Sequence, residues 1–137
     1  MNPDQLLERI AAVLRQDIGP AVGAEYPRTQ AFMAAVVLQK LGRQLACAEA
    51  HRAAEAADMD ALVADLDSTL ATAVVPPAIA AAVAALGRDR NDAALCALIG
   101  ALYESRTTLG ATRFDALLGR VRRTLRAGID RRMEFAE

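Results

Sequence analysis

The chain has 137 residues, with 16 basic and 17 acidic side chains and a formal net charge of −1. This balance excludes a global electrostatic field that would attract nucleic acid or an anionic membrane. Hydrophobic residues make up 54% and aromatic residues 4%, so the core must consist of Leu, Val, Ile and Ala, and the length favours one domain, residues 1–137, that folds without a metal ion or a disulfide.

The first predicted helix covers residues 3–18. Asn2 is a good N-cap, Pro3 suits the first helical position, and Leu6 and Ile10 belong to an apolar stripe at helical spacing. Gly19-Pro20 is expected to end this helix, and a loop is expected over residues 19–26.

A second helix is predicted over residues 27–57. Leu38, Leu41 and Leu45 keep a seven-residue rhythm, and Phe32 and Val36 lie on roughly the opposite side. Because the first half is apolar nearly all round, we expect it to be central or contacted from two directions. Its second half is polar and is expected at an edge.

No charged side chain occurs between Ser68 and Gly87. A third helix is predicted to begin at Asp58 as its N-cap and to end at Pro76-Pro77, which is followed by a fourth helix over residues 78–86. A fifth helix over residues 90–104 carries a second uncharged run, in which Gly100 is expected to permit close approach of a neighbouring helix. The prediction is an all-α fold, a bundle of about six helices around this Ala/Val/Leu-rich segment, shielded from water.

The last predicted helix covers residues 112–135, after a loop over residues 107–111. Residues 112–137 hold seven arginines against four acidic side chains, a composition found on nucleic-acid surfaces. These arginines scatter around the whole polar half of the helix, which favours a solvated face instead. Arg132 is the exception, because it projects from the apolar face and is a candidate for pairing or for an interface.

No catalytic, cofactor or metal site is predicted. Cys47, His51 and Glu55 are spaced four apart on one helix, but the chain has no CxxC or HxxxH spacing, and a surface His51–Glu55 pair is the simpler interpretation. Four carboxylates (Asp58, Asp60, Asp65 and Asp67) are read as helix-capping and solvated charges. We interpret Cys47 and Cys96 as reduced core residues, which together with an N-terminus unlike a signal peptide predicts a cytoplasmic protein.

Three short sequence segments resemble those of a known group of proteins. Residues 18–20 (Ile-Gly-Pro), 29–38 (Thr-Gln-Ala-Phe-Met-Ala-Ala-Val-Val-Leu) and 129–134 (Ile-Asp-Arg-Arg-Met-Glu) resemble those of small uncharacterised helical proteins of bacteria. Relatives of that kind are encoded beside acyl-CoA dehydrogenases and aminoglycoside-phosphotransferase-like kinases. The resemblance implies an accessory role in small-molecule metabolism and carries over no site residue.

The leading functional hypothesis is a non-catalytic accessory or protein-interaction bundle that associates with itself as a homodimer, with Phe32, Val36 and Arg132 as candidate interface residues. An alternative is the binding of a small apolar or acyl-type ligand between helices. The candidate pocket residues for that alternative are Val75, Ile79, Leu98 and Tyr103. A second alternative is nucleic-acid contact through the arginine-rich last helix.

Overall fold

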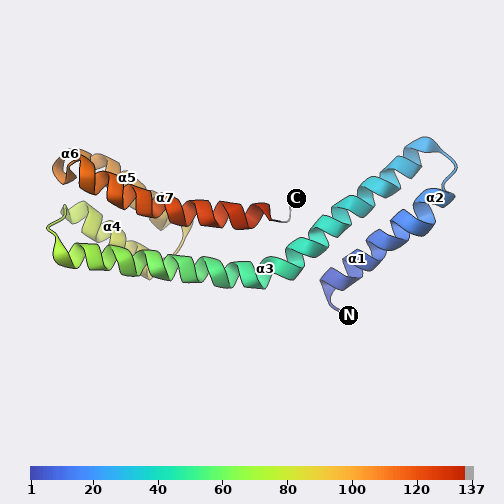
Figure 1. Ribbon diagram of the computed structural model, residues 1–137, viewed down its shortest axis with the longest axis horizontal. Helices are drawn as coiled ribbons and strands as arrows, with labels where there is room; N and C mark the ends of the chain where they lie inside the picture. Colours follow the sequence, from blue (N-terminus) through green and yellow to red (C-terminus); the bar gives the residue numbers. More distant parts are fainter. Residues whose placement is uncertain (135–137) are drawn as a thin grey trace. The chain divides into compact units, whose positions relative to one another are not determined.

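The computed structural model describes residues 1–134, and these form helices with no strand among them (Figure 1). The predicted all-α class is confirmed. The elements are, in chain order, α1 (Pro3–Val13), the π-helical segment η1 (Leu14–Ile18), α2 (Gly19–Ala21), α3 (Glu25–Thr72), α4 (Pro77–Arg88), α5 (Asp92–Glu104), α6 (Arg106–Leu109) and α7 (Ala111–Met133). The predicted end of the last helix at Phe135 lies outside the described residues.

The chain divides into two compact units, which are described separately. The N-terminal unit contains Met1–Ala53 and the described residues from Arg132 onward, and the C-terminal unit is Ala54–Arg131. α3 and α7 each contribute residues to both units. No helix within residues 1–134 has the combination of length and apolar content that a membrane crossing requires.

The N-terminal unit is a helical hairpin of α1 and the first half of α3 (Figure 1). α1 begins as predicted, and the Asn2 amide donates to Gln5 Oε1 at 3.2 Å. The predicted helix end at Gly19-Pro20 is wrong, because the helix continues through η1 and α2 to Ala21 and α3 already begins at Glu25. In an α-helix the Pro20 ring would collide with the carbonyl four residues earlier, and the wider π-helical turn before it relieves this collision.

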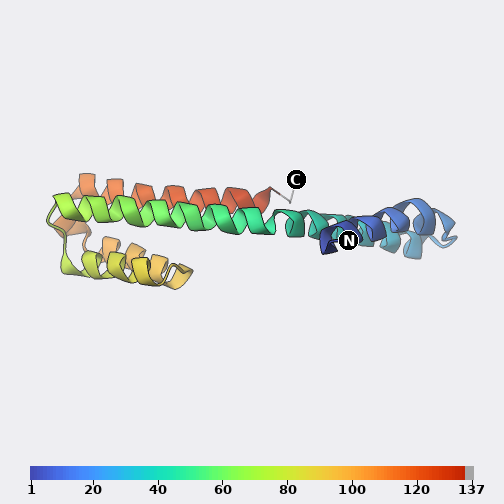
Figure 2. The ribbon, with the colours of Figure 1, turned by 90° about the horizontal axis from the view of Figure 1, so that it is seen from below.

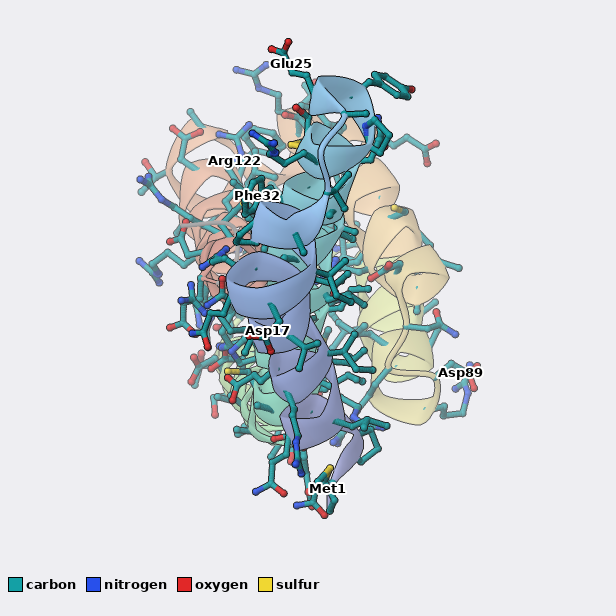
Figure 3. All side chains as sticks on the ribbon, turned by 90° about the vertical axis from the view of Figure 1, so that its right-hand side faces the viewer. Met1, Asp17, Glu25, Phe32, Asp89 and Arg122 are labelled. Atoms are coloured by element: carbon teal, nitrogen blue, oxygen red, sulfur yellow. The ribbon has the colours of Figure 1, made fainter. Side chains whose placement is uncertain are left out.

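Gly19 supports the same turn. Its amide donates to the Leu14 carbonyl across the π turn, and a Cβ at this position would lie 2.9 Å from the Leu14 oxygen and from the Phe32 ring. The Phe32 ring therefore packs directly against the glycine backbone; in Figure 3 Phe32 lies at the level of α2.

α3 is one helix of 48 residues, so the predicted boundary at Asp58 is wrong. Residues 43–72 contain neither Gly nor Pro. The polar stretch within this range, residues 49–58, is rich in Ala, Glu and Arg, which favour helix. Asp58 is consequently an interior helical residue. The half of α3 that was assigned to a separate helix supplies Leu62 and Leu66 to the core of the C-terminal unit.

The C-terminal unit packs the second half of α3 with α4, α5 and α7 (Figure 2). Its core is aliphatic apart from one Phe, as the composition predicted. The core contains fifteen buried residues, namely Leu62, Val63, Leu66, Ile79, Val83, Leu86, Leu95, Leu98, Ala101, Leu102, Leu109, Phe114, Leu117, Leu118 and Val121.

The uncharged run is covered on one side rather than throughout, so the predicted shielding of the whole segment is wrong. α4 buries Ile79, Val83 and Leu86, whereas Ala80 and Ala84 are exposed and Val74 is 91% exposed. Alanine has high helix propensity and little area to bury, so an alanine-rich face remains stable in water.

Two loop details also differ from prediction. Gly100 has open space where a Cβ would lie, so no neighbouring helix uses it for close approach. The expected loop over residues 107–111 overlaps the single turn α6 (Arg106–Leu109), which has Gly110 as its C-cap. Gly110 has φ of 82°, a left-handed conformation that favours glycine and lets α7 start at Ala111.

Candidate functional site

The fully buried positions of the N-terminal hairpin are occupied by small residues. Ala11, Ala31 and Ala35 are buried, and so are Gly19 and Gly42. At Gly42 a Cβ would lie 3.2 Å from the Asp4 carbonyl oxygen, so α1 and α3 approach closely. Within residues 1–53 no Leu, Ile, Val, Met or aromatic side chain is buried.

Leu7, Leu14, Phe32 and Leu38 are partly buried, but six other large apolar side chains of this hairpin are half-exposed. On α1 these are Leu6, Ile10 and Val13, at 40–49% exposure, and on α3 they are Val37, Leu41 and Leu45, at 44–54%. We call these six residues the hairpin face.

Helical geometry places both sets on the same side of the hairpin. At 100° per residue, each set is rotated in the same sense away from the line of contact between the two helices. The opposite edge is marked by a hydrogen bond from Arg15 Nη2 to Gln39 Oε1 at 3.3 Å. One side of the hairpin is therefore apolar and the other polar.

The α1 side of the hairpin face is hollowed. A depression of about 290 Å³ is lined by Leu6, Arg9, Ile10, Val13, Leu14 and Ile18. Arg9 contributes the single charged side chain of this lining. A complementary surface must therefore be mainly apolar as well.

The predicted interface residues occupy other positions. Phe32 is half-buried against Gly19 inside the hairpin. Val36 is 38% exposed and, three residues before Gln39, belongs to the polar edge. Arg132 is exposed and has an interaction partner. The sequence feature that indicated the hairpin face was the seven-residue spacing that includes Leu41 and Leu45. We had expected this half of the helix to be central or contacted from two directions.

Three of the four carboxylates in the acidic cluster of α3 pair with arginines of the C-terminal unit. Asp58 pairs with Arg131, Asp60 with Arg90, and Asp65 with Arg120 through a contact of 2.6 Å between Oδ2 and Nε. Two of these pairs connect α3 to α7. The carboxylates therefore fix the packing of helices rather than converging on a common point.

A groove of about 390 Å³ lies between the end of α3, the following connection and α7 in the C-terminal unit. We call it the arginine groove. It combines an apolar floor with three guanidinium groups and one carboxylate. Its lining residues are Asp65, Leu66, Ser68, Thr69, Ala73, Val75, Arg113, Ala116, Leu117, Arg120 and Arg123.

The spacing of Arg113, Arg120 and Arg123 puts all three on one flank of α7. We predicted that the seven arginines scatter around the polar half of the helix. That interpretation overlooked the subset at positions i, i+7 and i+10, whose spacing indicates a common flank. Arg113 Nη1 donates to the Val74 carbonyl at 3.1 Å, and Arg120 Nη1 donates to Thr124 Oγ1 at 2.8 Å. For Arg123 the described residues provide no hydrogen bond or ion pair, so its guanidinium is available.

The other arginines of α7 are also engaged by the protein. Arg122 Nη2 donates to the Tyr103 hydroxyl at 3.3 Å, Arg126 lies 3.9 Å from Asp130, and Arg131 pairs with Asp58. A surface that reads phosphates needs several free cations in one stripe. α7 gathers Arg113, Arg120 and Arg123 at a single groove and holds Arg122, Arg126 and Arg131 in contacts with the protein, so its described residues do not form a stripe along the helix.

Within the described residues, the four residues predicted to line one pocket do not lie around a single cavity. Ile79 and Leu98 belong to the packed core, and Val75 lines the arginine groove. Tyr103 is 48% exposed, and its ring meets Phe114 edge-on at 5.2 Å.

His51 was predicted to form a surface pair with Glu55. His51 Nε2 lies 2.9 Å from Glu134 Oε2 within the N-terminal unit, and no group of three or more metal-binding side chains occurs among residues 1–134. Cys47 is half-buried and Cys96 exposed, so the interpretation of both as core residues is wrong.

Comparison of the chain with family models, with curated proteins and with solved structures gave no match.

Proposed function

We propose that this protein is a non-catalytic interaction module that forms a homodimer through the hairpin face. The observation that carries the proposal is the contrast within the N-terminal unit, which buries alanine and glycine while its large apolar side chains stay half-exposed. A helical segment of this size has a marginal core and gains stability when a partner covers its apolar side chains.

The area available meets the lower bound for a specific dimer interface. Covering the hairpin face and the small residues between its members would remove roughly 500–600 Å² per copy, on the order of 1,100 Å² in total, above the ~1,000 Å² that a specific interface needs. The core of this area is uncharged, which is typical of a self-associating interface.

A second copy is the occupant that best fits the face. Two hairpins packed through their apolar sides make a four-helix bundle, in which each helix has two neighbours. A two-fold arrangement places the same mainly apolar surface on both sides, with the exposed Arg9 as the one charged side chain that lines its depression. The face has no carboxylate that would select a basic partner of another kind.

The test introduces a charge on the face. We expect Leu41→Glu and Ile10→Glu each to weaken self-association at least tenfold, because a buried carboxylate without a partner costs several kcal/mol. Sedimentation velocity over a concentration series measures this, and circular dichroism verifies the helix content.

Val36→Glu is the matched control, because Val36 has similar exposure on the polar edge of the same helix. It should leave self-association unchanged. If Val36→Glu dissociated the dimer and Leu41→Glu did not, the interface would include the residues first predicted, and the hairpin face would be excluded.

Two further parts of the functional interpretation remain proposals. A cytoplasmic location and an accessory role in small-molecule metabolism are consistent with a module that has no catalytic constellation in its described residues. Ligand binding between helices is favoured by the arginine groove, whereas nucleic-acid contact is disfavoured by the engagement of the α7 arginines.

A further inference from the structure

We infer that the arginine groove binds a small amphipathic anion, a carboxylate or phosphate carried on an apolar body. This inference concerns the C-terminal unit and does not depend on self-association through the N-terminal unit. Its volume of about 390 Å³ lies in the range of small-molecule pockets, ~300–1,000 Å³.

The charge of the lining selects an anion. Arg113, Arg120 and Arg123 face one carboxylate, Asp65, so the groove has a formal excess of two positive charges. Asp65 is occupied by Arg120 Nε, which leaves the negative charge neutralised inside the protein. A ligand anion would therefore meet the guanidinium groups without repulsion from a free carboxylate.

Arg123 is the key cation of the groove. Arg113 and Arg120 are held by the Val74 carbonyl and by Asp65, which fixes the position of their remaining N–H donors. Arg123 is exposed and makes no hydrogen bond or ion pair that the described residues supply. Two positioned arginines and one free arginine form a receptor that needs little rearrangement to bind an oxyanion.

The floor of the groove selects the rest of the ligand. Leu66, Val75, Ala116 and Leu117 supply apolar surface, and burying an apolar body against them is favourable. The Ser68 hydroxyl at the rim adds one polar group for orientation. An inorganic anion would leave the floor uncovered, and an apolar neutral molecule would leave the arginines without a partner.

The experiment titrates the full-length, ¹⁵N-labelled protein with four probes and follows backbone amide shifts. The probes are 2-naphthoate, 2-naphthyl phosphate, the neutral 2-naphthamide and inorganic phosphate. We expect both naphthyl anions to shift amides of residues 65–75 and 113–123, with affinities at least about tenfold above those of the other two probes. The tighter of the two anions identifies the head group as carboxylate or phosphate.

Matched variants separate charge from shape. Arg123→Gln should weaken the better anion about tenfold, whereas Arg126→Gln, which removes an equal charge on the same helix outside the groove, should leave the affinity unchanged. Ala116→Leu fills the floor and should weaken both naphthyl anions while all charges remain. Equal binding of 2-naphthamide, equal effects of the two arginine variants, or shifts confined to α1 would each overturn the inference.

Discussion

Glycines divide into two kinds in this protein, according to what their missing side chain makes possible. At Gly19 and Gly42 a Cβ would lie 2.9 Å and 3.2 Å from backbone oxygen atoms, so these positions set the close packing of the hairpin. Gly100, which the sequence suggested for such a role, has open space around it. The surroundings of a glycine depend on tertiary packing, and spacing along the chain does not reveal them.

Gly19→Ala should destabilise the hairpin by about 1–3 kcal/mol, because the new methyl group overlaps the Leu14 carbonyl and the Phe32 ring. Gly100→Ala should stabilise α5 by about 1 kcal/mol through helix propensity alone. Urea unfolding followed by circular dichroism measures both effects. Equal stability of Gly19→Ala and the unmodified protein would contradict the described packing at α2.

Ion pairs on α7 should differ in their contribution to the free energy of unfolding, according to their burial. The Arg131 side chain is 17% exposed and pairs with Asp58, whereas Arg126 and Asp130 are 85% and 71% exposed. Asp58→Asn should cost about 1–2 kcal/mol, because it leaves a largely buried guanidinium without its counter-charge. Asp130→Asn should cost less than about 0.5 kcal/mol. Thermal unfolding compares the two variants, and equal losses would contradict this ranking.

At the scale of whole helices, the sequence predicted which segments are helical better than it predicted where each helix begins and ends. Pro76-Pro77 correctly marked the start of α4, and Gly110 correctly separated α7 from the preceding segment. The boundary at Asp58 failed because a capping residue ends a helix only where the chain has an alternative conformation, and residues 43–72 contain no helix breaker. The prediction that the first helix ends at Gly19-Pro20 failed because a π-helical turn can accommodate proline.

The candidate sites were harder to predict than the helices. The apolar residues of the hairpin face are visible in the sequence, but whether a stripe faces the core or the solvent depends on which neighbours cover it. Likewise, the spacing of Arg113, Arg120 and Arg123 predicts one flank of a helix, yet their position opposite Asp65 requires the register between α3 and α7.

α4 should tolerate change on one side and not on the other. Leu86→Ala removes a fully buried side chain and should cost about 2–5 kcal/mol. Ala84→Ser alters the exposed side and should change stability by less than about 0.5 kcal/mol. If the two variants were equally stable in urea, the assignment of the buried face of α4 would be wrong.

At the scale of the molecule, the two units differ in how they are stabilised. The C-terminal unit has a largely aliphatic core of its own, supplied by α3, α4, α5, α6 and α7. The N-terminal unit instead leaves large apolar side chains half-exposed. We therefore expect the N-terminal unit to gain stability with protein concentration and the C-terminal unit to do so much less. Hydrogen exchange at two concentrations would detect this as added protection in α1, and uniform protection across both units would contradict it.

The most direct test of the central claim is sedimentation equilibrium of the unmodified, full-length protein. At about 10 µM, where a dimer of micromolar affinity is populated, we expect a mass approaching twice the chain's 14.5 kDa and a return toward the single-chain value on dilution. A mass of one chain at every concentration would show that the hairpin face does not join two copies.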